Sequence, residues 1–312
     1  MTMAEVFVKN EKSYKVQKII SNVLTFSFLG AIAIVVLVPF YWMILTSLKS
    51  STMIESIPPI LFLKPSQWQI WNYKALFEIV ESGPRAGQPL FPFFTYMKNT
   101  IVISIITTIG TSITTILAAF AFARLNFKGR DIVFAIIIAT MMIPGEIFIL
   151  TNFLTINKLG WYDIMNQSYS DAIFAMTLPF MTSVFYTFYL RQTFKQIPNE
   201  LYYAAKVDGT TDFKYLLKVM IPVAMPTIIT IIILNSMGAW SAYIWPAMVT
   251  TKDQFRLVSN GLRGAFTDSG SGRTDYGQQM ASAALVTAPL LVVFFVFRKQ
   301  IMRGVSRSGI KG

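Results

Sequence analysis

The stretch Gln196–Pro226, which reads QIPNELYYAAKVDGTTDFKYLLKVMIPVAMP, is a polar segment between two long apolar runs. Pro198 suits the first turn of a helix, where its missing N–H is no loss, and Glu200 places negative charge near the positive helix end. Gly209 can stop this helix in a left-handed conformation. A polar hairpin inserted between apolar runs is most simply a docking surface for another chain.

A second helix is predicted after Gly209. Thr210 or Thr211 can cap its start, and Pro222 either ends it or opens the next apolar run. Spacings of i, i+3, i+4 and i+7 predict that this helix carries one apolar stripe, formed by Phe213, Leu216, Leu217 and Met220.

The rest of the chain is dominated by apolar runs long enough to cross a bilayer. Apolar residues make up 54% of the chain and the mean hydropathy is +0.54, which predicts an all-α polytopic membrane protein. Six transmembrane spans are predicted, near residues 23–47, 97–122, 132–155, 171–190, 226–248 and 279–298. The corresponding division of the chain is an N-terminal segment (1–22), the first span (23–47), an outward segment (48–96), a membrane core (97–300) containing the polar loop 191–225, and a C-terminal tail (301–312).

Lysine and arginine indicate the orientation of these spans. If both termini are cytoplasmic, the cytoplasmic segments carry most of the 27 Lys and Arg residues although the opposite segments are longer. The positive-inside rule therefore puts the polar loop and both termini in the cytoplasm. The net charge of +12 does not indicate nucleic acid, because no basic module with interleaved aromatic residues lies outside the spans. Orientation and contact with anionic membrane lipid explain the charge better.

The chain contains no cysteine and no histidine. This excludes disulfides, thiolate nucleophiles, Ser-His-Asp catalysis and the usual zinc sites. A G-x-x-x-x-G-K-[ST] phosphate loop is also absent from the sequence. If a nucleotide drives this protein, another chain must bind it.

Two outward segments have distinct compositions. Residues 48–96 are rich in proline and aromatic residues and are predicted to form a structured cap. Residues Thr250–Gly277 contain five glycines and three arginines, which would let the backbone reach acidic or hydroxyl-rich partners. A flexible solvated loop is an equally good interpretation of that composition.

Glu146 is the one ionisable residue predicted to lie well inside a span. A charge at bilayer depth costs about 2.5 to 3.5 kcal/mol on insertion scales, so such a residue normally faces a cavity or a partner. Pro144 and Gly145 beside it should kink the helix. We interpret this region as lining a pathway or gate, with a hydrogen-bonded packing role for Glu146 as the alternative.

The fifth predicted span contains hydroxyl and aromatic side chains at helical spacing. Ser236, Trp240 and Tyr243 are predicted to share one face, and Gly238 to allow close approach of another helix. Aromatic faces beside hydroxyls suit an uncharged, hydroxyl-rich solute. Such residues also form interfacial belts, and we assign Trp245 to the belt.

These residues together resemble a known family, the permease subunits of bacterial ATP-binding-cassette importers, in the carbohydrate-uptake branch related to the maltose-type second permease. The family's cytoplasmic signature has an E-A-A-x-x-D-G core. Here Ala204, Ala205, Asp208 and Gly209 match it, and Tyr203 replaces the signature Glu. The resemblance covers about residues 20–312 and includes Leu190-Arg191-Gln192, Met142-Ile143-Pro144, Gly238-Ala239-Trp240, Trp245-Pro246 and Gly309-Ile310-Lys311-Gly312.

The resemblance implies a type I ABC importer permease fold in the bacterial cell membrane, with about six helices. The chain would pair with a second permease, and two cytoplasmic ATPases would bind the ATP and Mg, so this chain itself would need no cofactor. An extracytoplasmic solute-binding protein would deliver a sugar.

The resemblance also assigns roles to segments. It implies that the helix Pro198–Val207 rests in a cleft of the ATPase. It implies that the loop Thr250–Gly277 probes the binding protein and that the tail Gly304–Gly312 touches the ATPase. The predicted coupling surface consists of Pro198, Glu200, Tyr203, Ala204, Ala205, Asp208, Gly209 and Phe213. The predicted substrate pathway consists of Glu146, Ser236, Trp240 and Tyr243.

Two other functions were weighed. An ion-coupled secondary transporter should place charged pairs and discontinuous helices at the midplane, and one intramembrane glutamate beside a large cytoplasmic hairpin fits that poorly. A membrane-embedded enzyme would need paired carboxylates, a nucleophile with its base, or metal ligands, and the sequence shows none of these sets.

Overall fold

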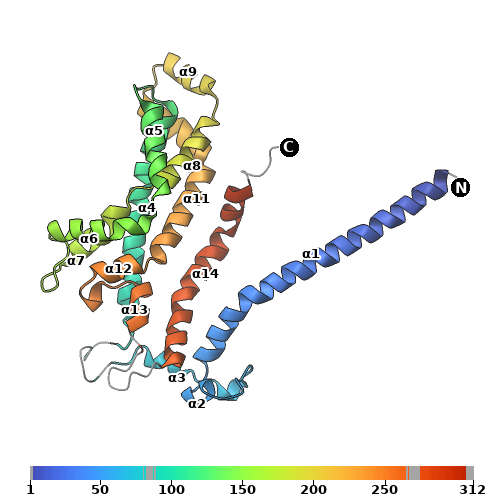
Figure 1. The fold of residues 1–312 in the computed structure, drawn as a ribbon, viewed down its shortest axis with the longest axis vertical. Coiled ribbons are helices and arrows are strands. Elements are labelled where there is room, and N and C mark those ends of the chain that lie inside the picture. Colours follow the sequence, from blue (N-terminus) through green and yellow to red (C-terminus); the bar gives the residue numbers. More distant parts are fainter. Residues whose placement is uncertain are drawn as a thin grey trace. The chain divides into compact units, whose positions relative to one another are not determined.

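The computed structural model describes residues 3–79, 81, 87, 89–264, 266 and 275–306. Helices are the only repeating secondary structure in these residues (Figure 1). Two compact units are distinguished, residues 1–75 with 268–284 and residues 76–267 with 285–312. Four helices are long and apolar enough to cross a membrane, or six if two bent helix pairs each count as one span. This confirms the predicted all-α fold with about six spans.

The first unit begins with a long helix, α1 (Met3–Ser47). Within its apolar segment Gln17–Ser47, the most hydrophobic window of 18 residues has no buried residue. Short helices follow at α2 (Ser51–Ile54), η1 (Pro65–Gln67) and α3 (Trp71–Ala75). The buried Asn72 Nδ2 donates to the carbonyls of Ser47 and Lys49, both at 2.9 Å, and so joins α3 to the end of α1.

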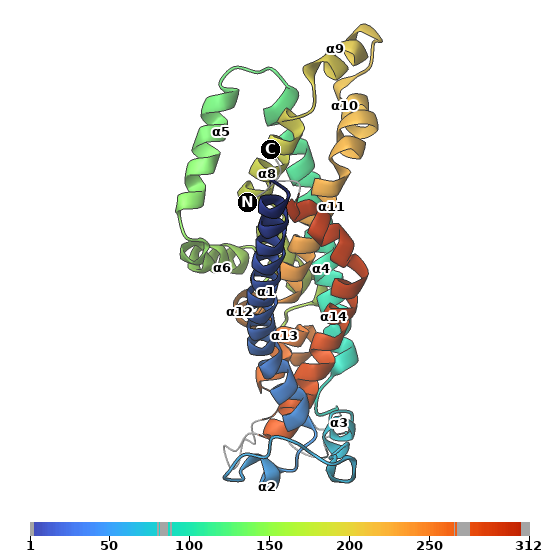
Figure 2. The ribbon, with the colours of Figure 1, turned by 90° about the vertical axis from the view of Figure 1, so that its right-hand side faces the viewer.

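The second unit is built around α4 (Phe93–Arg124), along which α8 (Val184–Lys195) and α11 (Ile221–Trp240) pack (Figure 2). Their contact is an apolar core near the C-terminal end of α4. The core consists of Ala119, Phe120, Leu190, Phe194, Ile197, Tyr215, Leu216, Met220, Ala224, Ile228 and Ile231. A second core near the N-terminal half of α4 consists of Ile103, Ile156, Ala172, Ala175, Met176, Trp245, Val249, Phe255 and Leu257.

One face of α4 is lined by buried hydroxyls rather than by large apolar groups. Thr111 Oγ1 donates to the Phe180 carbonyl at 2.8 Å, and Thr114 Oγ1 donates to the Met181 carbonyl at 2.6 Å. A Cβ on Gly110 would lie 2.6 Å from the Met181 side chain, so the two segments touch at van der Waals distance. Small and hydroxyl side chains let helices approach closely inside a membrane. The face consists of Thr100, Ser104, Thr107, Thr108, Thr111 and Thr115.

Two predicted spans are broken. The first break bends the chain by 83° between residues Arg130–Met142 and residues Gly145–Lys158. The segment before the bend contains α5 (Arg130–Ala139) and η2 (Thr140–Met142). The segment after it contains η3 (Gly145–Ile147) and α6 (Phe148–Lys158). The kink predicted at Pro144 is therefore confirmed, and it divides the predicted span 132–155 into two helical segments. The second bend, 51°, separates Tyr169–Phe180, which contain α7 (Tyr169–Thr177) and η4 (Leu178–Phe180), from α8.

The polar loop also differs from the prediction. Helix α9 (Asn199–Val207) is separate, but α10 (Asp212–Tyr215) continues through a π-helix, η5 (Leu216–Met220), into α11. The predicted second helix is thus the first part of the fifth span. The prediction of a single apolar stripe on this helix was wrong, because the i→i+5 turns of η5 change which side chains share a face of the helix. Leu216 and Met220 are buried, whereas Phe213 and Leu217 are exposed.

The fifth span ends earlier than predicted. Helix α11 stops at Trp240, and α12 (Ile244–Val249) starts after a break at Ser241–Tyr243. The outward loop that follows is structured over its first part, with η6 (Asp253–Phe255) and α13 (Val258–Gly264). Gly261 is packed there, since a Cβ would lie 2.4 Å from the Tyr96 ring. Residues 265 and 267–274 of this loop, like residues 307–312 of the C-terminal tail, lie outside the described residues. The last helix is α14 (Tyr276–Ser306).

Candidate functional site

Helix α9 projects from the second unit beyond the ends of α8 and α10 (Figures 1 and 2). Arg124, the last residue of α4, holds the connection between α8 and α9. Its guanidinium donates to the carbonyls of Phe194, at 2.7 Å, and Ile197, and to the Asn199 side chain. Because one guanidinium ties three points of the connection to α4, the start of α9 has a fixed position relative to the membrane core.

The end of α9 is fixed to α10 by a second polar cluster. Tyr202 Oη donates to Asp212 Oδ1 at 2.7 Å, and Lys206 Nζ lies 2.8 Å from the same oxygen. The hydrogen bond to Asp212 raises the pKa of Lys206. The Tyr202 ring also packs edge-on against Tyr215, with centroids 5.1 Å apart. These contacts hold α9 across the turn that follows it.

Gly209 forms that turn. Its φ is +69°, and the amide groups of Gly209 and Thr210 donate to the carbonyls of Lys206 and Ala205 at 3.0 and 2.9 Å. Residues with a side chain rarely adopt this conformation, so the prediction for Gly209 is confirmed. Thr211 Oγ1 accepts from the Lys214 amide at 3.3 Å and is the predicted cap of the next helix.

The predicted coupling residues lie together on this projection. Pro198 precedes the first turn of α9 instead of lying within it, which shifts the predicted helix start by one residue. Tyr203 is 63% exposed, so the residue that replaces the signature Glu points outward and fills no internal position. Ala205 is half-buried, and the exposed members of the set are Pro198, Glu200, Tyr203, Ala204, Asp208, Gly209 and Phe213.

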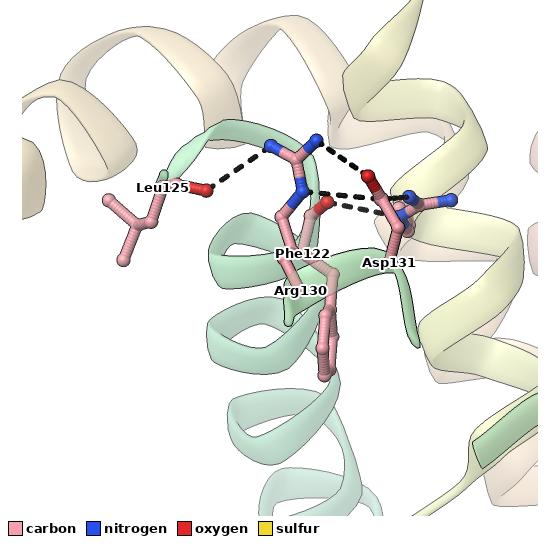
Figure 3. Close-up of polar contacts among 5 residues, drawn as sticks. Phe122, Leu125, Arg130 and Asp131 are labelled. Atoms are coloured by element: carbon pink, nitrogen blue, oxygen red, sulfur yellow. Dashed lines mark hydrogen bonds and ion pairs between the residues drawn. The ribbon is translucent and has the colours of Figure 1, made fainter. Parts of the chain in front are cut away.

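A further set of polar contacts joins the end of α4 to the start of α5 and to α8 (Figure 3). The buried Arg191 on α8 donates to the Phe122 carbonyl at 3.0 Å and pairs with Asp131 at 3.2 Å. Its guanidinium lies 3.8 Å from the centroid of the Phe134 ring. Arg130 reaches the same carboxylate at 3.2 Å and the Leu125 carbonyl at 3.3 Å. The sequence indicates the membrane orientation through these arginines and the family resemblance through Arg191, but it does not predict their structural contacts.

The second unit also contains a cavity of about 660 Å³. Its wall combines the N-terminal half of α4, the bend at Gly145 and Glu146, the end of α7, and the break after α11. Most of the lining is apolar, with Phe180 and Trp245 packed edge-on at 5.6 Å. The polar side chains in the wall are Thr107, Glu146, Tyr186, Asn235, Ser241 and Tyr243.

The four predicted pathway residues divide into two groups. Glu146 and Tyr243 line the cavity, whereas Ser236 and Trp240 do not. Ser236 Oγ instead lies 3.2 Å from Thr108 Oγ1 and connects α11 to α4. Trp240 is half-buried. The prediction that Ser236, Trp240 and Tyr243 share one helical face was wrong, because the helix ends at Trp240 and Tyr243 lies in the break.

Two smaller predictions in this region concern Trp245 and Gly238. Trp245 is not an interfacial belt residue, because it is 6% exposed and its Nε1 donates to the Ala175 carbonyl at 2.9 Å. No described segment of this chain packs closely on Gly238, since no atom lies within 4 Å of a Cβ built there, and Gly238 lines the cavity instead. The error at Trp245 arises from the break after α11, which turns the residues that follow it into the protein.

The fold is that of a multi-pass membrane protein, from which the helix α9 projects. The family model described as "binding-protein-dependent transport system inner membrane component" matches residues 111–307. The chain therefore belongs to this family, whose members are permease subunits of ATP-binding-cassette importers in the inner membrane. The sequence alone indicates the same family, through the residues of the polar loop together with motifs along about residues 20–312.

Curated relatives align over nearly the whole chain. The inner membrane ABC transporter permease protein YcjP of Escherichia coli is 28% identical over 91% of this chain and 94% of its own length. The arabinooligosaccharides transport system permease protein AraQ of Bacillus subtilis is 27% identical with the same coverage. The trehalose/maltose transport system permease protein MalG of Thermococcus litoralis is 28% identical over 91% and 95%.

A solved structure has the same fold. It is a crystal structure of a bacterial ABC transporter involved in the import of the acidic polysaccharide alginate. One of its chains superposes with a TM-score of 0.73 at 22% identity, over 92% of this chain and 97% of that chain. At this identity the likeness concerns the arrangement of the helices, not the substrate.

Proposed function

We propose that this chain is a permease subunit of an ATP-driven importer that takes up a sugar delivered by an extracytoplasmic binding protein. The observation that supports the proposal most directly is the projecting helix α9, fixed at both ends by Arg124 and Asp212 while most of its signature residues are exposed. The names of AraQ and MalG, which refer to arabinooligosaccharides and to trehalose and maltose, support a sugar as the solute.

In the proposed mechanism, α9 lies in a cleft of a cytoplasmic ATPase that binds the ATP and Mg. Movement of the ATPase would be transmitted through the contacts of Arg124 and Asp212 to α4 and α11. These two helices contribute Thr107 and Asn235 to the cavity wall, so their displacement would change access to the cavity. A second permease subunit would complete the pathway.

The docking proposal is tested by cross-linking, which the absence of native cysteine makes simple. Val207 is 88% exposed at the end of α9, so Val207→Cys should cross-link to single cysteines in the ATPase. Met165 is 80% exposed in the loop between α6 and α7 and provides the matched control, Met165→Cys. Equal cross-linking of both variants would contradict the docking proposal.

The same variants test the orientation. A membrane-impermeant maleimide added to intact cells should label Met165→Cys and leave Val207→Cys unlabelled, because α9 and both termini are proposed to be cytoplasmic. Labelling of Val207→Cys from outside would reverse the orientation.

ATP dependence is tested with the full complex in proteoliposomes, where sugar uptake should require internal ATP and resist ionophores. Uptake that collapses with the ion gradient would favour a secondary transporter.

A further inference from the structure

The cavity of the second unit has an unbalanced charge. Among the described residues that line it, Glu146 is the only Asp, Glu, Lys or Arg. Within the described part of the chain, no hydrogen bond or ion pair joins the Glu146 carboxylate to another residue. By contrast, Arg191 and Lys206 are paired with carboxylates, and Arg124 is paired with backbone carbonyls.

The backbone presents Glu146 to the cavity. Ile143 and Pro144 are extended, with ψ of 120° and 132°, and Glu146 lies in the short η3 helix that follows the 83° bend. Gly145 has no atom within 4 Å of a Cβ built on it, so the backbone borders open space here. A carboxylate at membrane depth needs water, a cation or a hydrogen-bond donor in that space.

Thr107 is a second polar group in the cavity wall without a hydrogen-bond partner among the described residues. It is 5% exposed, lines the same cavity, and its Oγ1 makes no hydrogen bond to any described residue. Buried hydroxyls in native proteins usually have a partner. The cavity therefore holds an unpaired acceptor and an unpaired hydroxyl within walls that are otherwise mostly apolar.

We propose that Glu146 makes this cavity selective for uncharged, hydroxyl-rich solutes and excludes anionic ones. The inference rests on the proposed function as a sugar importer and adds the charge class of the sugar. Sugar O–H groups can donate to the Glu146 carboxylate and to Thr107, while the C–H faces of the ring pack against Phe180 and Trp245. A carboxylate or phosphate on the solute would meet a like charge with no cation in this wall to offset it.

This selectivity does not follow from the fold. The solved structure with the same helix arrangement is from a transporter for an acidic polysaccharide, and the relatives AraQ and MalG are named for arabinooligosaccharides and for trehalose and maltose. The side chain at the bend, rather than the helix arrangement, is inferred to decide between the two charge classes.

The test compares a neutral sugar with its own oxidised form. Maltotriose, trehalose and arabinotriose are first screened for ATP-dependent uptake by the full complex in proteoliposomes. Each sugar and its derivative oxidised from primary alcohol to carboxylate are then bound to the detergent-solubilised complex without the binding protein, by equilibrium dialysis. Wild type should bind at least one neutral sugar, with an affinity at least about tenfold above that for its oxidised form.

Variants assign the preference to one side chain. Glu146→Gln keeps the size and removes the charge, and should reduce the neutral-to-acidic ratio to near one. Glu146→Asp keeps the charge and should retain the preference. Glu78→Gln makes the same chemical change at an exposed residue outside the cavity and should leave the ratio unchanged.

Two failures are distinguishable. Equal binding of both sugar forms by wild type, an unchanged ratio in Glu146→Gln, or no binding of any neutral sugar overturns the inference about the cavity. Absence of ATP-dependent uptake of the screened sugars contradicts the proposed function instead. The dialysis measurement still reports on the cavity in that case, because it needs neither ATP nor the binding protein.

Discussion

The two ends of α4 differ in how they accommodate polar and charged groups. At the C-terminal end, Arg124 and the nearby Arg191 each bind carbonyl or carboxylate oxygens, and the apolar core around Phe194 surrounds them. In the N-terminal half, Thr107, near the middle of α4, lines a cavity together with Glu146, and neither side chain has a partner among the described residues. Paired groups make a rigid support, whereas unpaired groups leave hydrogen-bonding capacity for a solute. This difference supports the proposal that the C-terminal end of α4 transmits force and that the cavity side contacts the solute.

The largest effect is expected from Gly209→Pro at the α9 end. Proline fixes φ near −65°, whereas Gly209 has φ +69° and donates its amide to Lys206, so the turn must rearrange at a cost of about 3 kcal/mol or more. We expect ATP hydrolysis to continue while sugar uptake falls to background. The ratio of ATP hydrolysed to sugar imported measures this uncoupling.

Gly160 provides a matched control for that experiment. It has φ +75° and donates its amide to Asn157, so Gly160→Pro creates the same kind of strain in a turn remote from α9. This variant should lower stability without raising the ATP-to-sugar ratio. Uncoupling of similar size in both variants would mean that strain in any turn, and not the position of α9, causes the effect.

A smaller effect is expected at the cavity end. Tyr243→Ala removes a cavity-lining side chain and should raise the KM for sugar uptake by about tenfold, which corresponds to losing one hydrogen bond of about 1.4 kcal/mol. Trp240→Phe changes a residue outside the cavity and removes a buried N–H that has no partner among the described residues. Its KM should stay within about twofold of wild type. Equal changes in both variants would remove the distinction between these aromatic residues.

The rigidity of the α9 end can be measured with Arg191→Ala. This change leaves the Phe122 carbonyl without its donor and removes packing on Phe134, so we expect destabilisation of about 1 to 3 kcal/mol. The Asp131 carboxylate adds little to this figure because it is 68% exposed. Arg130→Ala, at a more exposed arginine on the same carboxylate, should cost less. Thermal unfolding of the purified complex compares the two, and an equal loss would contradict the assigned support role of Arg191.

The smallest effect on stability is expected at Tyr203. Its side chain is exposed, so Tyr203→Glu should change the free energy of unfolding by no more than about 0.5 kcal/mol. We expect the affinity for the partner ATPase to fall several-fold, because that surface is proposed to match an aromatic group. An unchanged affinity would indicate that Tyr203 lies outside the docking surface.

Sequence reasoning was most successful where structure depends on neighbouring residues. The apolar runs predicted the number of spans, Pro144 predicted a kink, and Gly209 predicted the left-handed helix end. Predictions of which side chains share a helix face were wrong where a regular α-helix was assumed to continue. The π-helix Leu216–Met220 and the break after Trp240 changed which side chains share a face. No local signal in the sequence fixes either position.

The sequence by itself determined the membrane class, the family and the projecting polar helix, because these depend on composition, short spacings and the residues of the signature. Only the tertiary structure decided which side chains meet. It placed Trp245 against Ala175, 70 residues away, and Arg191 beside Phe122, 69 residues away. It also brought Glu146 and Tyr243 into one cavity while excluding Ser236 and Trp240. Such contacts depend on bends of 83° and 51° and on the packing of α8 and α11 along α4, and periodicity within one helix carries no information about them.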